Sequence, residues 1–147
     1  MHPYPHTYVV SASGADSGAV ELQSQGLPGL STAAPPEFDG PGGVWSPETL
    51  LCASVANCLV LTFRAIARAS RFEWSAIECR TEAVLDKVDG VSRFTRYTSH
   101  VKLRVPAGAD PARAHQLLEK AERGCLVANS LLGERVLVVS LETKGQA

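Results

Sequence analysis

The first 63 residues contain no lysine and no arginine, although the chain of 147 residues carries 14 basic and 15 acidic side chains in total. The formal net charge of −1 gives no attraction to nucleic acid or to an anionic membrane surface. No apolar run reaches the ~18 residues that a membrane-spanning helix needs. We therefore expect neither nucleic acid nor a membrane among the partners of this protein.

The sequence also lacks the features of a secreted or metal-binding protein. Residues 1–6 contain no basic stretch followed by an apolar one, so a signal peptide is not expected. Four cysteines occur without a Cys-x-x-Cys pair, and the four histidines show no ligand spacing, so we expect no metal and no cofactor. Without a secretory signal, cysteines indicate a reducing compartment with free thiols, and we expect a cytoplasmic protein.

Length and composition are those of a globular protein, with 45% hydrophobic and 20% charged residues. The length predicts a single domain over residues 1–147. Two short β-like runs at residues 8–10 and 19–23 come first, and a third is suggested near residues 27–30. A loop rich in proline and glycine follows at residues 35–45.

The best-marked boundary is the start of a helix at Ser46. Its side chain can cap the first N–H groups, Pro47 suits the first helical position, and Glu48 is favoured there by the helix dipole. No charge occurs from Leu50 to Phe63, which predicts a helix buried on all sides.

The second half of the chain alternates strands and helices. Two strands are predicted at residues 75–88 and 91–105, and Asp89-Gly90 is typical of the hairpin turn between them. A helix capped by Asp110 follows, then a further helical turn within residues 125–132 and a last strand at residues 135–141. The order β-β-(β)-α-β-β-α-β predicts an α+β fold.

Cys58 lies inside the uncharged helical run, and Cys125 follows Gly124 after the second predicted helix. Either alone could be a small buried hydrophobic residue. Together they suggest a redox site in which one thiol attacks an oxidant and the other forms a disulfide with the product. Cys52 and Cys79 are expected to be core residues.

The chain resembles the OsmC/Ohr family, the osmotically inducible protein C and organic hydroperoxide resistance proteins. The resemblance rests on three segments: residues 42–51, Ala56-Asn57-Cys58, and residues 125–129. It implies antiparallel sheets around a buried central helix in an intertwined homodimer, with sites at the subunit interface.

The resemblance also implies a function and its residues. Cys58 would be the thiol that attacks an organic hydroperoxide, alkyl or lipid, and Cys125 would resolve the sulfenic acid. Glu48 would hold an arginine against the reactive thiol. A small dithiol or a lipoylated protein would restore both thiols.

One feature of the family is missing, because its arginine in the N-terminal β region has no counterpart here. Arg64, Arg80 or Arg93 could replace it; otherwise burial would raise the pKa of the Cys58 thiol unopposed. The alternative function is therefore a non-catalytic relative that binds a small apolar ligand at the dimer interface.

Overall fold

The computed structural model describes residues 1–143, which fall into two compact units, one over Met1–Leu51 and one that begins at Cys52. Each unit is described by itself. The first contains β1 (Ser11–Ser13), β2 (Val20–Gln23), β3 (Leu30–Thr32), the 3-10 turn η1 (Pro36–Phe38) and the start of α1 (Pro47–Ala69). The second contains the rest of α1, β4 (Ala76–Val88), β5 (Val91–Val105), α2 (Pro111–Arg123), α3 (Leu126–Asn129) and β6 (Glu134–Thr143).

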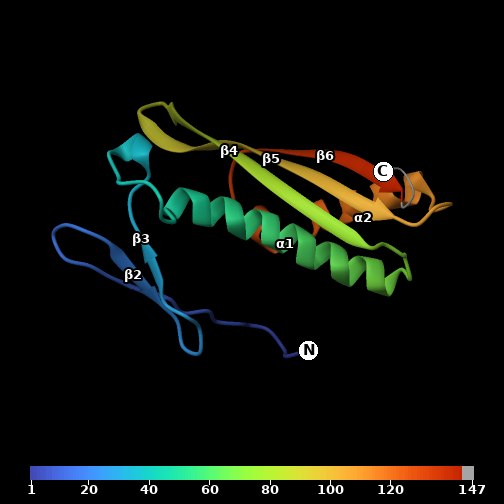
Figure 1. Ribbon diagram of the computed structural model, residues 1–147, viewed down its shortest axis with the longest axis horizontal. Coiled ribbons are helices and arrows are strands. Elements are labelled where there is room, and N and C mark those ends of the chain that lie inside the picture. The colour runs from blue at the N-terminus through green and yellow to red at the C-terminus, as the bar shows by residue number, and fades with distance from the viewer. Residues whose placement is uncertain (144–147) are drawn as a thin grey trace. The chain divides into compact units, whose positions relative to one another are not determined.

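The first unit is built on a small antiparallel sheet in the order β1-β2-β3 (Figure 1). The first strand begins at Ser11 and not at residues 8–10 as predicted, since the register pairs Ser11 with Gln23 at the end of β2. The third strand also starts later than the sequence suggests. A turn in which the Leu27 N–H donates to the Ser24 carbonyl comes first, and β3 begins at Leu30.

Helix α1 begins where the sequence predicts. The Ser46 hydroxyl accepts from the Thr49 N–H at 3.2 Å, and the Ser46 N–H donates to Thr49 Oγ1 at 2.9 Å. This reciprocal pair satisfies N–H groups that the first turn of a helix leaves free. The cap fixes where α1 begins and therefore the position of each cysteine along the helix.

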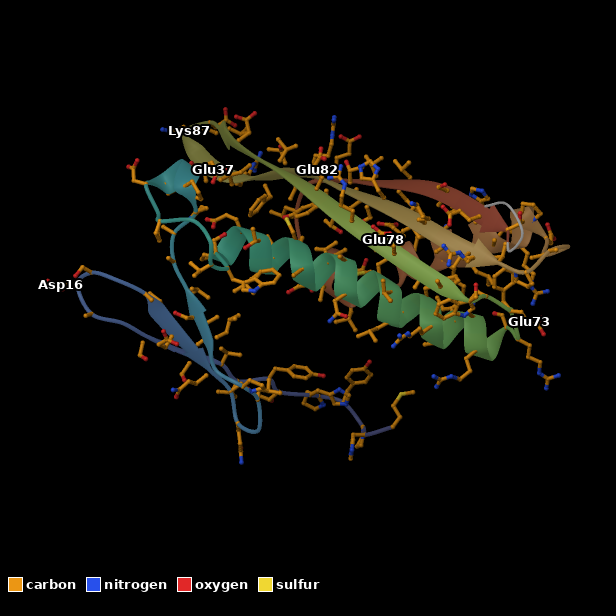
Figure 2. All side chains as sticks on the ribbon, viewed as in Figure 1. Asp16, Glu37, Glu73, Glu78, Glu82 and Lys87 are labelled. Atoms are coloured by element: carbon orange, nitrogen blue, oxygen red, sulfur yellow. The ribbon has the colours of Figure 1, made fainter. Side chains whose placement is uncertain are left out.

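The second unit contains a three-stranded sheet in the order β4-β5-β6, with α1 running alongside it (Figure 1). Strands β4 and β5 form the predicted hairpin around Asp89-Gly90, both at positive φ. Alternation along β4 is also present, since Ile77 is half-buried whereas Glu78 and Glu82 (labelled in Figure 2) are exposed.

Strand β6 is parallel to β5, so the sheet is mixed and not purely antiparallel as the sequence led us to expect. The reason lies in the connection between the strands. Helices α2 and α3 carry the chain back to the end of the sheet where β5 enters it, and a crossover of this kind returns a strand in parallel. This return brings the start of β6 close to the end of α2.

The core of the second unit gathers residues of α1, β5 and α2, with Phe63, Leu103 and Leu118 fully buried. Within this chain α1 buries one side only, through Val55, Leu59, Phe63 and Ala67. Leu61 on another side is 50% exposed, because the sheet and α2 cover only one face of the helix.

By length and hydropathy alone, α1 could cross a membrane, but core helices of soluble proteins also meet this criterion. The packing of α1 against β5 and α2 is that of a core helix. Its apolar character is therefore accounted for in part by the core of the second unit.

Candidate functional site

Cys58 lies on α1, one turn before Thr62, and its side chain is half-buried. The two side chains face each other, with 3.9 Å between Cys58 Sγ and Thr62 Oγ1. A residue four positions along a helix lies on the same side, so the hydroxyl is held beside the sulfur by the helix itself.

Cys125 occupies the turn between α2 and α3, where it is 1% exposed. Its N–H donates to the Glu122 carbonyl at 3.2 Å, and its carbonyl accepts from the Asn129 N–H at 2.9 Å. Gly124 lies beside α1, where a Cβ added to it would be in ordinary contact with Cγ2 of Thr62, at 3.5 Å. The turn thereby places Cys125 and the start of α3 beside Cys58.

The surroundings of Cys58 lower the pKa of its thiol. Burial acts to raise this pKa, but a hydrogen bond from the Val127 backbone, one from the Cys125 thiol and weaker ones from Thr62 and the Leu126 backbone lower it more. Hydrogen bonds to the charged form of a group favour that form. Cys58 is therefore the thiol of the pair that ionises first.

The pKa of Cys125 moves in the opposite direction and is raised to about 11. Burial is the main cause, and the hydrogen bond and negative charge of Cys58 add to it. A backbone hydrogen bond at Ala128 and the positive charge of Arg135 act against the rise. When Cys58 ionises, the Cys125 thiol therefore stays protonated and donates a hydrogen bond to the Cys58 thiolate.

The expectation that burial would raise the pKa of Cys58 unopposed is wrong in this respect. Backbone donors and a second thiol oppose the burial, and the groups of the described chain that shift this pKa include no arginine. Of the arginines considered as replacements, Arg64 and Arg93 are exposed and Arg80 pairs with Glu82 at 3.0 Å on an exposed strand face.

Arg135 on β6, which sequence reasoning missed, lies beside Cys125. Its Nε lies 2.6 Å from Oε1 of Glu122, and its side chain also donates to the Glu122 carbonyl and to Asn129 Oδ1. In sequence Arg135 follows Glu134 at the start of a strand and has no local signal of a special role. Only the return of β6 beside α2 brings it to Cys125.

Glu48, the third candidate site residue, belongs to the first unit. Its Oε2 is buried and has no hydrogen-bond partner among residues 1–143. A buried carboxylate oxygen without a donor is costly, so this atom indicates a missing partner. The role of Glu48 beside the thiols stays a prediction.

Cys52 and Cys79 differ from the candidate pair. Burial is the main cause that raises the pKa of each thiol above its ordinary value. Cys79 packs against the hydrophobic core, and Cys52 is half-buried. Across residues 1–143, no three side chains of the His, Cys, Asp or Glu type are grouped so that they could hold a metal ion.

A small cavity lies beside Cys125, lined by residues that include Val55, Tyr97, Ser99, Glu122 and Arg135. Its volume of ≈ 10 Å³ is about the space that one water molecule needs. The cavity beside Cys125 is therefore too small for an organic molecule.

Comparison with known proteins connects this arrangement to one family. Residues 40–140 match the family model described as OsmC-like protein. The chain is 28% identical over 117 residues to the uncharacterized protein YmaD of Bacillus subtilis, covering 78% of each chain. It is 28% identical over 106 residues to peroxiredoxin OsmC of Escherichia coli, covering 72% of this chain and 73% of that protein.

Solved structures agree with the sequence match. An organic hydroperoxide resistance protein OsmC from Legionella pneumophila superposes with a TM-score of 0.75 and 26% identity, over 95% of this chain and 99% of that one. Because the family model covers more than half of the chain, and the fold agrees, the protein belongs to the OsmC-like family.

Proposed function

We propose that this protein is a thiol-dependent peroxidase that reduces organic hydroperoxides. The observation that carries the proposal is the contact between Cys58 and Cys125, whose pKa values are shifted in opposite directions. A peroxidase of this kind needs one cysteine that ionises readily and a second that stays protonated until the first has been oxidised. Relatives named peroxiredoxin and organic hydroperoxide resistance protein support the same class of reaction.

In the first step the Cys58 thiolate attacks the terminal oxygen of the hydroperoxide. The O–O bond breaks, the alkoxide leaves and takes up a proton to become an alcohol, and Cys58 carries the oxygen as a sulfenic acid. The backbone N–H of Val127 and the Cys125 thiol hold the attacking sulfur in its charged form.

In the second step Cys125 loses its proton and attacks the sulfur of Cys58. The S–S bond forms, the S–O bond breaks, and the oxygen leaves as water after taking up a proton. A dithiol, either a small molecule or a lipoylated protein, then reduces the disulfide by two exchange reactions and becomes a disulfide itself. We propose that this cycle takes place in the cytoplasm.

Apolar side chains near Cys58 suit an alkyl or lipid chain better than a small polar oxidant. Leu126, whose N–H faces Cys58, is 67% exposed, and Leu61 lies three residues beyond Cys58 on α1. Burial of their apolar surface against a hydroperoxide tail contributes about 25 cal/mol for each Å². Hydrogen peroxide offers no such surface.

We also propose a homodimer, because α1 leaves apolar side chains such as Leu61 uncovered in the single chain. The unpartnered oxygen of Glu48 supports the same proposal, since a second subunit would supply a hydrogen-bond donor. Sedimentation at micromolar concentration tests it, and a monomer would exclude a second subunit as the partner of Glu48.

The experiment that tests the function is stoichiometric oxidation of the reduced protein. One equivalent of cumene hydroperoxide should yield one Cys58–Cys125 disulfide by peptide mapping, with Cys52 and Cys79 still alkylatable. A Cys125→Ser variant should instead accumulate sulfinic acid on Cys58 with excess oxidant. Cys52→Ser is the matched control and should behave as the wild type.

Two outcomes would contradict the proposal. A Cys58–Cys52 disulfide would remove Cys125 from the resolving role. Failure of the reduced protein to consume cumene hydroperoxide, with all four thiols intact, would favour the alternative of a non-catalytic protein that binds a small apolar ligand.

A further inference from the structure

Arg135 is held by two separate parts of the chain that flank Cys125. Its Nε donates to Oε1 of Glu122 at 2.6 Å, and a terminal nitrogen donates to the Glu122 carbonyl. The other terminal nitrogen donates to Asn129 Oδ1 at 2.7 Å. Glu122 lies in the last turn of α2 and Asn129 ends α3, so one guanidinium connects both ends of the turn that carries Cys125.

The same contact involves the backbone of Cys125. The carbonyl of Glu122 that accepts from Arg135 also accepts from the Cys125 N–H at 3.2 Å. The Arg135 and Glu122 side chains are only 25% and 22% exposed, in contrast to 55% and 59% for the ion pair of Arg96 and Glu134 nearby. Water screens a half-buried pair less than an exposed one.

Four titratable groups face Cys125 from the elements packed around it. Cys58 approaches from α1, Glu122 from α2, Tyr97 from β5 and Arg135 from β6. Cys58 as a thiolate opposes ionisation of Cys125, and Arg135 favours it. Tyr97 is neutral near pH 7, since an ordinary tyrosine hydroxyl has a pKa near 10 and burial raises it further. Once Cys58 is oxidised to a neutral sulfenic acid, its opposition ends and Arg135 remains.

We propose that Arg135 is a positioning residue for the resolving step: its guanidinium clamps the turn that carries Cys125 and favours the thiolate of Cys125 after Cys58 has been oxidised. The inference rests on the proposed peroxidase cycle and adds a residue to it. This role of Arg135 also places the two steps in order, since Cys125 stays protonated until an oxidant has reacted with Cys58.

The test follows Cys125 without any peroxide. In a Cys52→Ser/Cys79→Ser background, Cys58 attacks an aromatic disulfide such as 5,5′-dithiobis(2-nitrobenzoate), and one aryl thiolate leaves as a mixed disulfide forms. Cys125 then loses its proton to solvent and attacks Cys58 in that mixed disulfide, releasing the second aryl thiolate. The second phase, measured from pH 6 to 11, reports the ionisation of Cys125, through its rate below the midpoint and through the midpoint itself.

Arg135→Gln should slow the second phase about tenfold at pH 7 and raise its pH midpoint by about one unit, with the first phase nearly unchanged. Arg135→Lys should return the midpoint to within about half a unit of the wild type, since the charge is retained. Glu122→Gln should lower the midpoint, because it removes the negative charge that offsets Arg135. Arg96→Gln, in the exposed ion pair, is the matched control and should change neither phase.

An unchanged midpoint in Arg135→Gln would overturn the proposal, as would equal slowing at every pH, which indicates a structural role alone. If Arg135→Gln does not fold, Glu122→Gln decides the question by a lowered midpoint at an unchanged near-UV circular dichroism spectrum, because loosening would expose Cys125 and lower the midpoint as well. An unchanged midpoint in a folded Glu122→Gln would overturn the proposal. A protein that reacts with the aromatic disulfide in this way but consumes no hydroperoxide would refute the proposed function and leave the role of Arg135 intact.

Discussion

Cys58 and Cys79 have nearly the same immediate neighbour and opposite properties. Both are half-buried, and each sulfur lies 3.9 Å from a threonine hydroxyl, Thr62 for Cys58 and Thr81 for Cys79. The pKa of Cys58 is nevertheless lowered, whereas that of Cys79 is raised, mainly by burial. Neither partial burial nor a neighbouring hydroxyl therefore decides whether the pKa of a thiol is lowered or raised.

The difference lies in the backbone around the two sulfurs. Cys79 lies on β4 opposite Val101 of β5, and its donors are the hydroxyls of Thr81 and Ser99. Cys58 faces the start of α3, where N–H groups have no partner within the helix, and Val127 and Leu126 donate to it. The backbone donors at the start of α3 thus distinguish Cys58 from Cys79.

The strongest test of this comparison is to remove each sulfur in turn. Cys58→Ser should reduce the rate of hydroperoxide consumption by at least about a thousandfold, because a serine hydroxyl is a far poorer nucleophile than a thiolate. Cys79→Ser should retain the wild-type rate. Consumption of cumene hydroperoxide in the presence of dithiothreitol measures both. Equal losses in the two variants would show that the site is not at Cys58.

A second test compares the pH at which the two thiols react. One variant retains Cys58 and Cys125, and the other retains Cys79 and Cys125. In each, the alkylation rate of Cys58 or Cys79 follows the fraction of that thiol present as thiolate. The midpoint for Cys58 should lie below the ordinary thiol value near 9.0, and the midpoint for Cys79 above it. The iodoacetamide rate between pH 5 and 10, followed by mass spectrometry, gives both midpoints. A midpoint above 9 for Cys58 would mean that its backbone donors do not outweigh burial.

The sequence predicts the helices and strands that carry Cys58 and Cys79 better than it predicts which of these elements are in contact. Ser46, Pro47 and Asp110 mark helix starts, and Asp89-Gly90 marks a hairpin, because each is a local preference of the backbone. The contact of Cys58 with α3 is not local, and neither is the parallel return of β6. The lowered pKa of Cys58 depends on N–H groups, which every residue except proline carries and which sequence cannot distinguish.

Arg135 illustrates the same limit in another way. Its neighbours in sequence describe an ordinary strand start with a charged pair, Glu134-Arg135. Glu134 pairs with Arg96 on the exposed side of the sheet, while Arg135 reaches Glu122. Alternation along a strand predicts that the two side chains lie on opposite faces of the sheet, but not which residue each will contact.

Alkaline pH should separate Cys125 from the other thiols through stability. The pKa of Cys125 is about 11 in the folded protein and near 9.0 when unperturbed, so between these values the folded state binds more protons than the unfolded state. Stability from this thiol is fully present below pH 9 and is lost as pH rises towards 11, by about 1.4 kcal/mol per pH unit. Urea unfolding of Cys58→Ser and Cys58→Ser/Cys125→Ala at pH 8.5, 9.5 and 10.5 measures the slope, because Cys58 would otherwise lose the hydrogen bond that it accepts from Cys125.

The slope should be less negative in Cys58→Ser/Cys125→Ala, whatever the change in absolute stability from the lost sulfur. Cys52 and Cys79, whose pKa values are also raised, remain in both proteins and contribute equally. Identical slopes would show that Cys125 ionises at an ordinary pH in the folded state. That result would remove the contrast between the two thiols of the pair.

The smallest expected effect tests whether the threonines matter at all. Thr62→Val keeps the shape of the side chain and removes the hydroxyl beside Cys58, and Thr81→Val does the same beside Cys79. Each should raise the alkylation midpoint of its cysteine by only a few tenths of a unit, about a twofold loss of rate below the midpoint. For Cys58 this follows because the backbone of Val127 and the Cys125 thiol contribute more than Thr62. A rise of more than one unit in Thr62→Val would mean that the hydroxyl, and not the start of α3, makes Cys58 reactive.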